Sequence, residues 1–212
     1  CGLQLPAGLD SIWQTASIVA VAVDDRPLGA FALADTPKAD SAAAIARLHA
    51  HGIATHIMSG DTQNTVSYIA TQLGITQATG GMSPRDKAAA VQALKAAGKV
   101  VVMVGDGIND APALAAANVS FAMQGGADVA AHTASATLMQ HSINQLVDAL
   151  LISRATLKNI KQNLFFAFIY NVLGIPLAAF GYLNPIIAGA AMALSSISVL
   201  GNAMRLKRAK IE

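Results

Sequence analysis

Two carboxylates and an amide follow a short, continuous apolar run. Residues 99–104 read KVVVMV, with a glycine on each side, and Asp106, Asn109 and Asp110 come soon afterwards. An uninterrupted apolar run predicts a strand buried on both faces, so these polar side chains leave its carboxyl end on a glycine-rich turn. Carboxylates together with phosphate are the ligands that Mg²⁺ prefers. An ordinary turn before a helix starting at Pro112 is the alternative, but the number of specified positions favours a magnesium site.

A second polar group follows another predicted strand. Ser59, Gly60 and Asp61 come after the run IATHIM at 53–58, where the chain turns into a helix. A hydroxyl and a backbone N–H at the start of a helix can bind a phosphate, although the same position suits an N-cap. Asp61 is expected to hold this loop or to face a nucleotide.

Lys87 lies in the first turn of a predicted helix. Ser83 and Asp86 have the spacing of a capping box, and Pro84 takes the first helical position. The Lys87 ammonium group would supply the positive charge that phosphoryl transfer needs around the transferred phosphate. A lysine on a helix surface is more often simply solvated, so this role depends on the neighbouring motifs.

The order of predicted elements indicates an α/β fold. Two strands, 17–23 and 28–34, flank a tight turn, and helix and strand then alternate. Helices are predicted over 36–51, 62–73 and 84–98, and strands over 53–58, 99–104 and 119–122. Such alternation is typical of a doubly wound parallel sheet, in which ligands bind at the carboxyl ends of the strands. We expect residues 1–142 to form this cytoplasmic domain.

The second half of the chain is almost uncharged. Residues 164–183 and 185–204 contain no charged side chain, and each stretch can cross a hydrocarbon core of about 30 Å. Hydrophobic residues make up 54% of the chain, which favours two transmembrane helices over a buried helical hairpin in a soluble protein. Basic residues lie in a linker helix, 143–163, and in a tail, 205–212. We therefore expect a multi-pass protein of the plasma (inner) membrane. Both ends of the chain are expected to lie in the cytoplasm.

The composition gives no sign of a nucleic-acid partner. Charged residues are only 12% of the chain and the net charge is +2, so no extended basic face is expected. The five histidines and the single cysteine show no paired spacing of the kind that binds zinc.

Three of these motifs resemble those of one family. The stretch VGDGINDAPALAAANV, at 104–119, resembles the hinge motif of P-type ATPases, members of the haloacid-dehalogenase-like phosphotransferase group. Residues 59–61 resemble the Thr-Gly-Asp element of that family, and residues 84–87 resemble its Pro-x-x-Lys element. The resemblance implies a haloacid-dehalogenase-like fold in a membrane pump, with ATP as substrate and Mg²⁺ as cofactor. It assigns catalysis to Ser59, Gly60, Asp61, Lys87 and Asn109, and Mg²⁺ binding to Asp106 and Asp110.

The nucleophile that the resemblance requires is not in these 212 residues. In P-type ATPases an aspartate in a DKTGT motif attacks the γ-phosphate of ATP, and no DKTGT occurs here. We therefore expect the chain to be the C-terminal part of a pump whose N-terminal part is missing, and to be inactive by itself.

A few polar side chains lie inside the two uncharged stretches. Tyr170 and Asn171 are in the middle of the first, and Met192 and Ser196 are one helical turn apart in the second. A thioether with neutral oxygen and amide groups suits Cu⁺ better than Zn²⁺, and the pattern resembles that of Cu⁺-exporting P-type ATPases. These four residues are predicted ligands of a transported Cu⁺. The alternative is methionine as a core filler and serine as a small residue at a helix contact.

Two other functions fit parts of the pattern. A membrane-tethered phosphatase of the same superfamily would need its own nucleophilic aspartate, and Asp24 and Asp25 lie in a turn that does not fit. A non-catalytic partner of an intact pump would need no nucleophile. The leading interpretation is the exporting copper pump.

Overall fold

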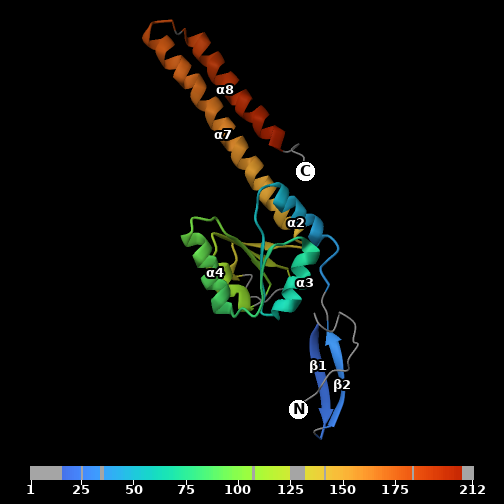
Figure 1. Ribbon diagram of the computed structural model, residues 1–212. Helices are drawn as coiled ribbons and strands as arrows, with labels where there is room; N and C mark the ends of the chain where they lie inside the picture. The colour runs from blue at the N-terminus through green and yellow to red at the C-terminus, as the bar shows by residue number, and fades with distance from the viewer. Residues whose placement is uncertain are drawn as a thin grey trace. The chain divides into compact units, whose positions relative to one another are not determined.

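Two compact units make up the chain, Cys1–Val147 and Asp148–Glu212. The structure, a computed structural model, describes residues 16–24, 26–33, 36–106, 108–124, 132–140, 142–182 and 184–206. The first unit contains the strands and the short helices, and the second contains two long helices (Figure 1).

An antiparallel hairpin forms the first described part of the chain. Strand β1 (Ser17–Val23) pairs with β2 (Arg26–Leu33), as predicted, with Ser17 opposite Leu33. The turn contains Asp24 at a φ of 48°, a left-handed conformation that Asp tolerates better than most residues. The hairpin forms a sheet of its own, and large apolar side chains such as Leu28 and Phe31 are exposed on it. It buries little apolar surface, and an isolated hairpin is marginally stable at best.

The other strands are all parallel. Strand β3 (His56–Met58) pairs with β4 (Gln77–Thr79), and β5 (Val102–Gly105), β6 (Val119–Met123) and β7 (Ala136–Leu138) form a second sheet in that order. The sequence predicted β3, β5 and β6 but not β4 or β7. Among the described residues the parallel strands thus form two sheets and not the single sheet that was expected.

The helices begin and end where local hydrogen bonds are satisfied. Helices α2 (Ser41–Ala50), α3 (Gln63–Leu73), α4 (Pro84–Ala96) and α5 (Ala111–Ala116) alternate with the parallel strands, and a 3₁₀ turn (Ile108–Asp110) precedes α5. Ser83 and Asp86 form the predicted capping box at α4. Gly74 ends α3 at a φ of 69°, a conformation that favours glycine.

A small apolar core fixes α4 and α5 against β5 and β6. Its buried members come from these four elements: Val91, Met103, Ala113, Leu114 and Ala122. Met58, at the end of β3, packs against the same cluster. The core therefore positions the start of α4 and the 3₁₀ turn relative to the end of β5.

A polar contact ties α2 to the first residues of helix α7 (Asn144–Ala179). The Asp40 carboxylate accepts hydrogen bonds from the Ser142 hydroxyl and from Asn144 Nδ2, the latter at 3.2 Å, and Arg47 donates to Asn144 Oδ1 at 2.9 Å. The Ser142 and Asn144 hydrogen bonds lower the pKa of Asp40 below its ordinary value. These bonds join segments about a hundred residues apart in the sequence, so the root of α7 is anchored in the first unit.

In the second unit, α7 and α8 (Pro185–Leu206) lie side by side (Figure 1). Asn159 and Asn163 hydrogen-bond to Asn202, and Tyr170 bonds to Ser198, so the two helices are antiparallel. The expected linker helix, 143–163, is continuous with the first expected span in one helix. Within the part of the chain that the structure describes, α7 is long and apolar enough to cross a membrane.

Candidate functional site

An ion pair joins α4 to the 3₁₀ turn after β5. Lys87 Nζ donates to Asp110 Oδ1 at 2.8 Å, and their side chains are only 12% and 13% exposed. The second oxygen of the same carboxylate, Oδ2, accepts the backbone N–H of Asp106 at 3.4 Å. Asp110 is therefore held from two sides, and it fixes the Lys87 ammonium group beside the carboxyl end of β5.

Gly105 is the residue that allows this arrangement. A Cβ at this position would lie 2.6 Å from Asp110 Cβ and 2.8 Å from Asp110 Oδ2, which is too close for any non-bonded carbon contact. Glycine is required here because the Asp110 side chain occupies the space that a side chain at 105 would fill. The neighbouring Asp106 is exposed, and its carboxylate has no hydrogen-bond partner among the described residues.

The loop after β3 carries the second polar group. The Ser59 hydroxyl donates to Asp61 Oδ2 at 2.7 Å and accepts the backbone N–H of Asp61 at 3.2 Å. The Gly81 N–H donates to the Asp61 carbonyl at 2.6 Å. Gln63 braces the loop, since its Oε1 accepts from Gly80 N at 2.7 Å. Sequence reasoning missed Gln63, because a glutamine in the first turn of a helix carries no motif.

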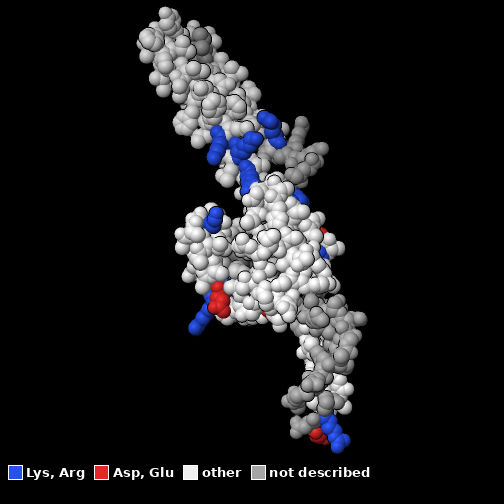
Figure 2. Space-filling model, in the orientation of Figure 1, with Lys and Arg blue, Asp and Glu red and all other residues white. Residues whose placement is uncertain are grey.

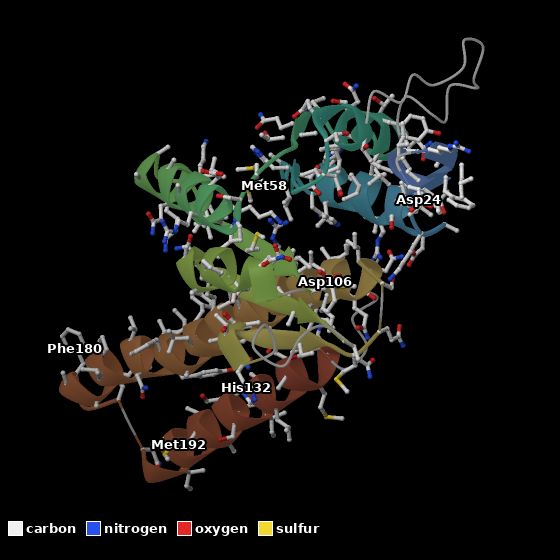
Figure 3. All side chains as sticks on the ribbon, turned by 90° about the horizontal axis from the view of Figure 1, so that it is seen from below. Asp24, Met58, Asp106, His132, Phe180 and Met192 are labelled. Atoms are coloured by element: carbon white, nitrogen blue, oxygen red, sulfur yellow. The ribbon has the colours of Figure 1, made fainter. Side chains whose placement is uncertain are left out.

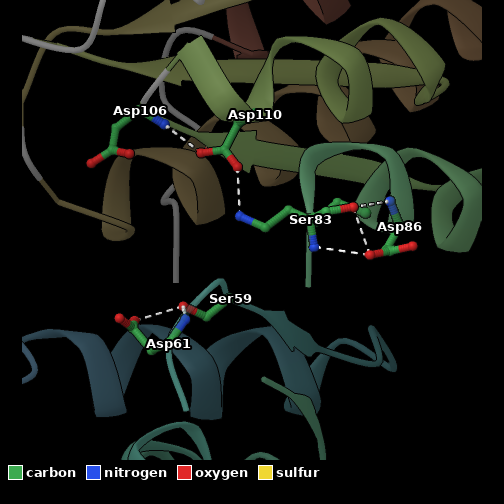
Figure 4. A network of polar contacts seen from close by, with 7 residues as sticks. Ser59, Asp61, Ser83, Asp86, Asp106 and Asp110 are labelled. Atoms are coloured by element: carbon green, nitrogen blue, oxygen red, sulfur yellow. Dashed lines mark hydrogen bonds and ion pairs between the residues drawn. The ribbon is translucent and has the colours of Figure 1, made fainter. Parts of the chain in front are cut away.

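The two polar groups lie across from one another. Ser59 and Asp61 extend from the end of β3, and Asp106 and Asp110 follow the end of β5 (Figure 4). No hydrogen bond between the described residues joins one group to the other. Asn109 is exposed on the 3₁₀ turn, and Gly60 is exposed next to Ser59. The structure therefore gathers the predicted catalytic residues at the carboxyl ends of two parallel strands.

The two carboxylates predicted to bind Mg²⁺ differ in their contacts. Both oxygens of Asp110 contact protein groups. Asp106 carries the carboxylate that is open to a ligand. No group of three or more His, Cys, Asp or Glu side chains that could hold a metal ion is found among the described residues.

The four predicted Cu⁺ ligands contact hydroxyl or backbone groups of the helix pair, or are exposed. The Tyr170 hydroxyl lies 3.2 Å from Ser198 Oγ, and Ser196 Oγ instead donates to the Met192 carbonyl at 3.1 Å on its own helix. Asn171 Nδ2 donates to the Ala167 carbonyl at 3.1 Å, also on its own helix. The Met192 side chain is 74% exposed (Figure 3).

Comparison with known proteins identifies the family. A model of the haloacid dehalogenase-like hydrolases matches residues 4–118, more than half of the chain and all of both polar groups. The chain belongs to the haloacid dehalogenase-like hydrolases.

The relatives of this haloacid dehalogenase-like chain are cation pumps. It is 70% identical over 210 residues to a probable cation-transporting ATPase of Haemophilus influenzae, covering 99% of this chain and 29% of that protein. It is 47% identical over 194 residues to a copper-exporting P-type ATPase of Bacillus subtilis, covering 92% of this chain and 24% of that protein. The chain thus spans less than a third of the length of these relatives.

A solved structure extends the likeness to the helices. A zinc-transporting PIB-type ATPase in the E2.Pi state has a TM-score of 0.80 and 36% identity, covering 92% of this chain and 32% of that one. The haloacid dehalogenase-like chain is therefore related to P-type ATPase cation translocases over nearly its whole length.

Proposed function

We propose that the chain is the C-terminal part of an ATP-driven P-type ATPase that exports Cu⁺. Residues 1–142 would belong to its phosphorylation domain, 143–163 to a linker, 164–204 to its last two membrane helices and 205–212 to a cytoplasmic tail. The Lys87–Asp110 ion pair beside the open Asp106 carboxylate carries the proposal. Together they place a fixed positive charge next to a carboxylate that can bind a metal ion, and phosphoryl transfer requires both.

The residues present fit a magnesium ion. Mg²⁺ usually takes one or two carboxylates, completes its shell with water and phosphate oxygens, and offsets charge on the phosphate. Asp106 would be its protein ligand, and Asp110 would orient Lys87 and the Asp106 backbone. The ammonium group of Lys87 would bind an equatorial phosphate oxygen, and the Ser59 hydroxyl and the Gly60 backbone would bind the phosphate from the opposite side. Asn109 and Asp61 would support the two loops.

The nucleophile would come from a strand outside these 212 residues. Strands β3 and β5 are each at an edge of their sheet, and a further parallel strand between them would join the two sheets into one doubly wound sheet. A hollow of about 610 Å³ is lined by residues of β3, β4 and α4, among them Met58, Ala90 and Leu94. An apolar strand running through that hollow would bury this surface. Its carboxyl end would emerge between Ser59 and Asp106, where an aspartate could attack a bound γ-phosphate.

The helix pair would form two membrane spans. Helix α7 meets the requirement by length and apolar composition, and residues 185–204 of α8 contain no charge. Lysine and arginine side chains gather at one end of the pair, where α7 begins and α8 ends (Figure 2). By the positive-inside rule that end is cytoplasmic. This agrees with a cytoplasmic phosphorylation domain attached to the root of α7.

Copper would bind at the exposed faces of these helices. Asn171 and Met192 are exposed in this pair, and exposed polar side chains within a span are costly unless another helix covers them. Tyr170, Asn171, Met192 and Ser196 would therefore complete a site with helices of the pump that lie outside this chain. Sulfur with neutral oxygen ligands favours Cu⁺ over Zn²⁺.

The phosphorylation role is tested with Asp106→Asn in the intact pump. We expect phosphoenzyme formation from radiolabelled ATP to fall by about two orders of magnitude or more, because the amide cannot replace the carboxylate as a magnesium ligand. Asp24→Asn is the matched control. It makes the same chemical change at an exposed turn, and Asn tolerates the φ of 48° found there. Normal phosphorylation of Asp106→Asn would restrict Asp106 to a structural role.

A further inference from the structure

A basic stripe lies on α7 just before its uncharged part. Arg154, Lys158, Lys161 and Phe165 follow one another at spacings of four, three and four residues, which places them on one face of a helix. They line a hollow of about 590 Å³ together with Leu157, Gln162 and Phe166. The hollow is therefore cationic at one end and aromatic at the other.

This stripe faces away from α8. The residues of α7 that bond to α8 are Asn159, Asn163 and Tyr170. At about 100° per residue they point roughly opposite to Lys158 and Lys161. Among the described residues neither lysine ammonium forms an ion pair or a hydrogen bond. The lysine side of the hollow is thus directed toward the surroundings of the helix pair and not toward α8.

The depth of the two lysines fits the layer of lipid phosphates. If 164 is the first residue in the hydrocarbon core, Lys161 lies about 4.5 Å outside it and Lys158 about 9 Å, at about 1.5 Å per residue. The headgroup layer on each side of a bilayer is about 5–8 Å thick. Lys161 therefore lies within that layer and Lys158 near its outer edge, while Phe165 and Phe166 lie just inside the hydrocarbon core.

We propose that this hollow binds an anionic phospholipid of the cytoplasmic leaflet. The phosphate group would lie between Lys158 and Lys161, with Arg154 at the outer rim, and an acyl chain would pack on Phe165 and Phe166. The charge of the stripe has one sign: from 149 to 204 no acidic residue occurs. A negatively charged headgroup compensates the positive charge of the stripe. A zwitterionic headgroup compensates it less well, because it also carries a positive charge. The inference rests on the proposed membrane insertion of α7.

The test measures lipid binding to the intact pump without ATP or metal. Delipidated pump in neutral detergent is titrated with phosphatidylglycerol or phosphatidylcholine, and bound lipid is counted by native mass spectrometry. We expect selective binding of phosphatidylglycerol, weakened about fivefold by Lys158→Gln or Lys161→Gln and about 25-fold by both changes together. Lys158→Arg keeps the charge and should bind normally. Arg205→Gln removes a positive charge from the last turn of α8, outside the hollow, and this variant should also bind phosphatidylglycerol normally.

Three results would overturn the inference. These are equal binding of the two lipids, unchanged phosphatidylglycerol binding in the double variant, and displacement of the lipid by inorganic phosphate at equal concentration, which would indicate a soluble-anion site. Cu⁺-dependent phosphoenzyme is measured in the same preparation. Loss of lipid selectivity with intact Cu⁺ dependence refutes only the lipid site. If lipid selectivity depends on the lysines but phosphoenzyme formation does not depend on Cu⁺, the lipid site is supported and only the copper assignment is refuted.

Discussion

Gly105→Ala would place a methyl group where the structure has no room for one. The new Cβ would lie 2.6 Å from Asp110 Cβ and 2.9 Å from its Cγ, so the Asp110 side chain would have to move by about 1 Å to restore ordinary carbon contacts. That movement would stretch the Lys87–Asp110 bond beyond its present 2.8 Å. It would also break the contact from Asp106 N to Asp110 Oδ2.

The expected cost is that of an overpacked site, about 1–3 kcal/mol. A multidomain pump does not unfold in two states, so local opening is the better measure. Hydrogen exchange of peptides covering 99–110 in the intact pump should therefore lose about 5- to 150-fold of its protection.

Gly60→Ala is the contrasting variant. The nearest atom to a Cβ at position 60 is the Met82 carbonyl oxygen at 3.7 Å, an ordinary contact, and the backbone there is not left-handed. Exchange of the peptide covering 53–62 should change by about twofold or less. If Gly105→Ala leaves exchange near β5 unchanged, or if Gly60→Ala loosens its own loop as much, the steric argument is wrong.

Three further predictions concern the cap of α4, the separate chain and the membrane ligands. Ser83→Ala should weaken the start of α4 by about 1 kcal/mol at neutral pH, seen as faster exchange over 83–91. The Ser83 hydrogen bonds lower the pKa of Asp86 below its ordinary 3.8, so the part of this stabilisation that the Asp86 carboxylate contributes is complete above that pH and is lost as the pH falls through the lower folded value. The 212-residue chain alone should form no hydroxylamine-sensitive phosphoenzyme, and acid-stable labelling from ATP would contradict this. Met192→Leu keeps bulk but removes sulfur, so Cu⁺-stimulated turnover of the intact pump should fall; a normal rate would leave Met192 a packing role.

Features decided by neighbouring residues could be predicted from the sequence. The capping box of Ser83 and Asp86 and the strand predicted over 99–104 depend on residues a few positions apart. The capping box is confirmed, and the strand forms over Val102–Gly105. Strands β4 and β7 were missed because neither ends a longer strand-like run, as β3 ends the run at 53–58, and each is defined by its pairing with a distant strand.

Roles decided by tertiary contacts could not be predicted in the same way. The motif placed Asp110 correctly at the site, but its contact with Lys87 crosses 23 positions in the sequence and depends on how α4 packs on β5. For the helix pair, the spacing of residues along the sequence shows which of them share a face of one helix. It does not show which residues of α7 lie opposite which residues of α8. That register is set by contacts such as Asn163 with Asn202, and it places Tyr170 against Ser198.

Metal uptake into inside-out membrane vesicles tests the central claim most directly. Vesicles containing the intact pump are given ATP and Mg²⁺ under reducing conditions, with either Cu⁺ or Zn²⁺ as the transported ion. The proposed function predicts ATP-dependent accumulation of Cu⁺ and none of Zn²⁺, because uptake into such vesicles corresponds to export from the cell. Accumulation of Zn²⁺ without Cu⁺, or no ATP-dependent uptake of either ion, would contradict it.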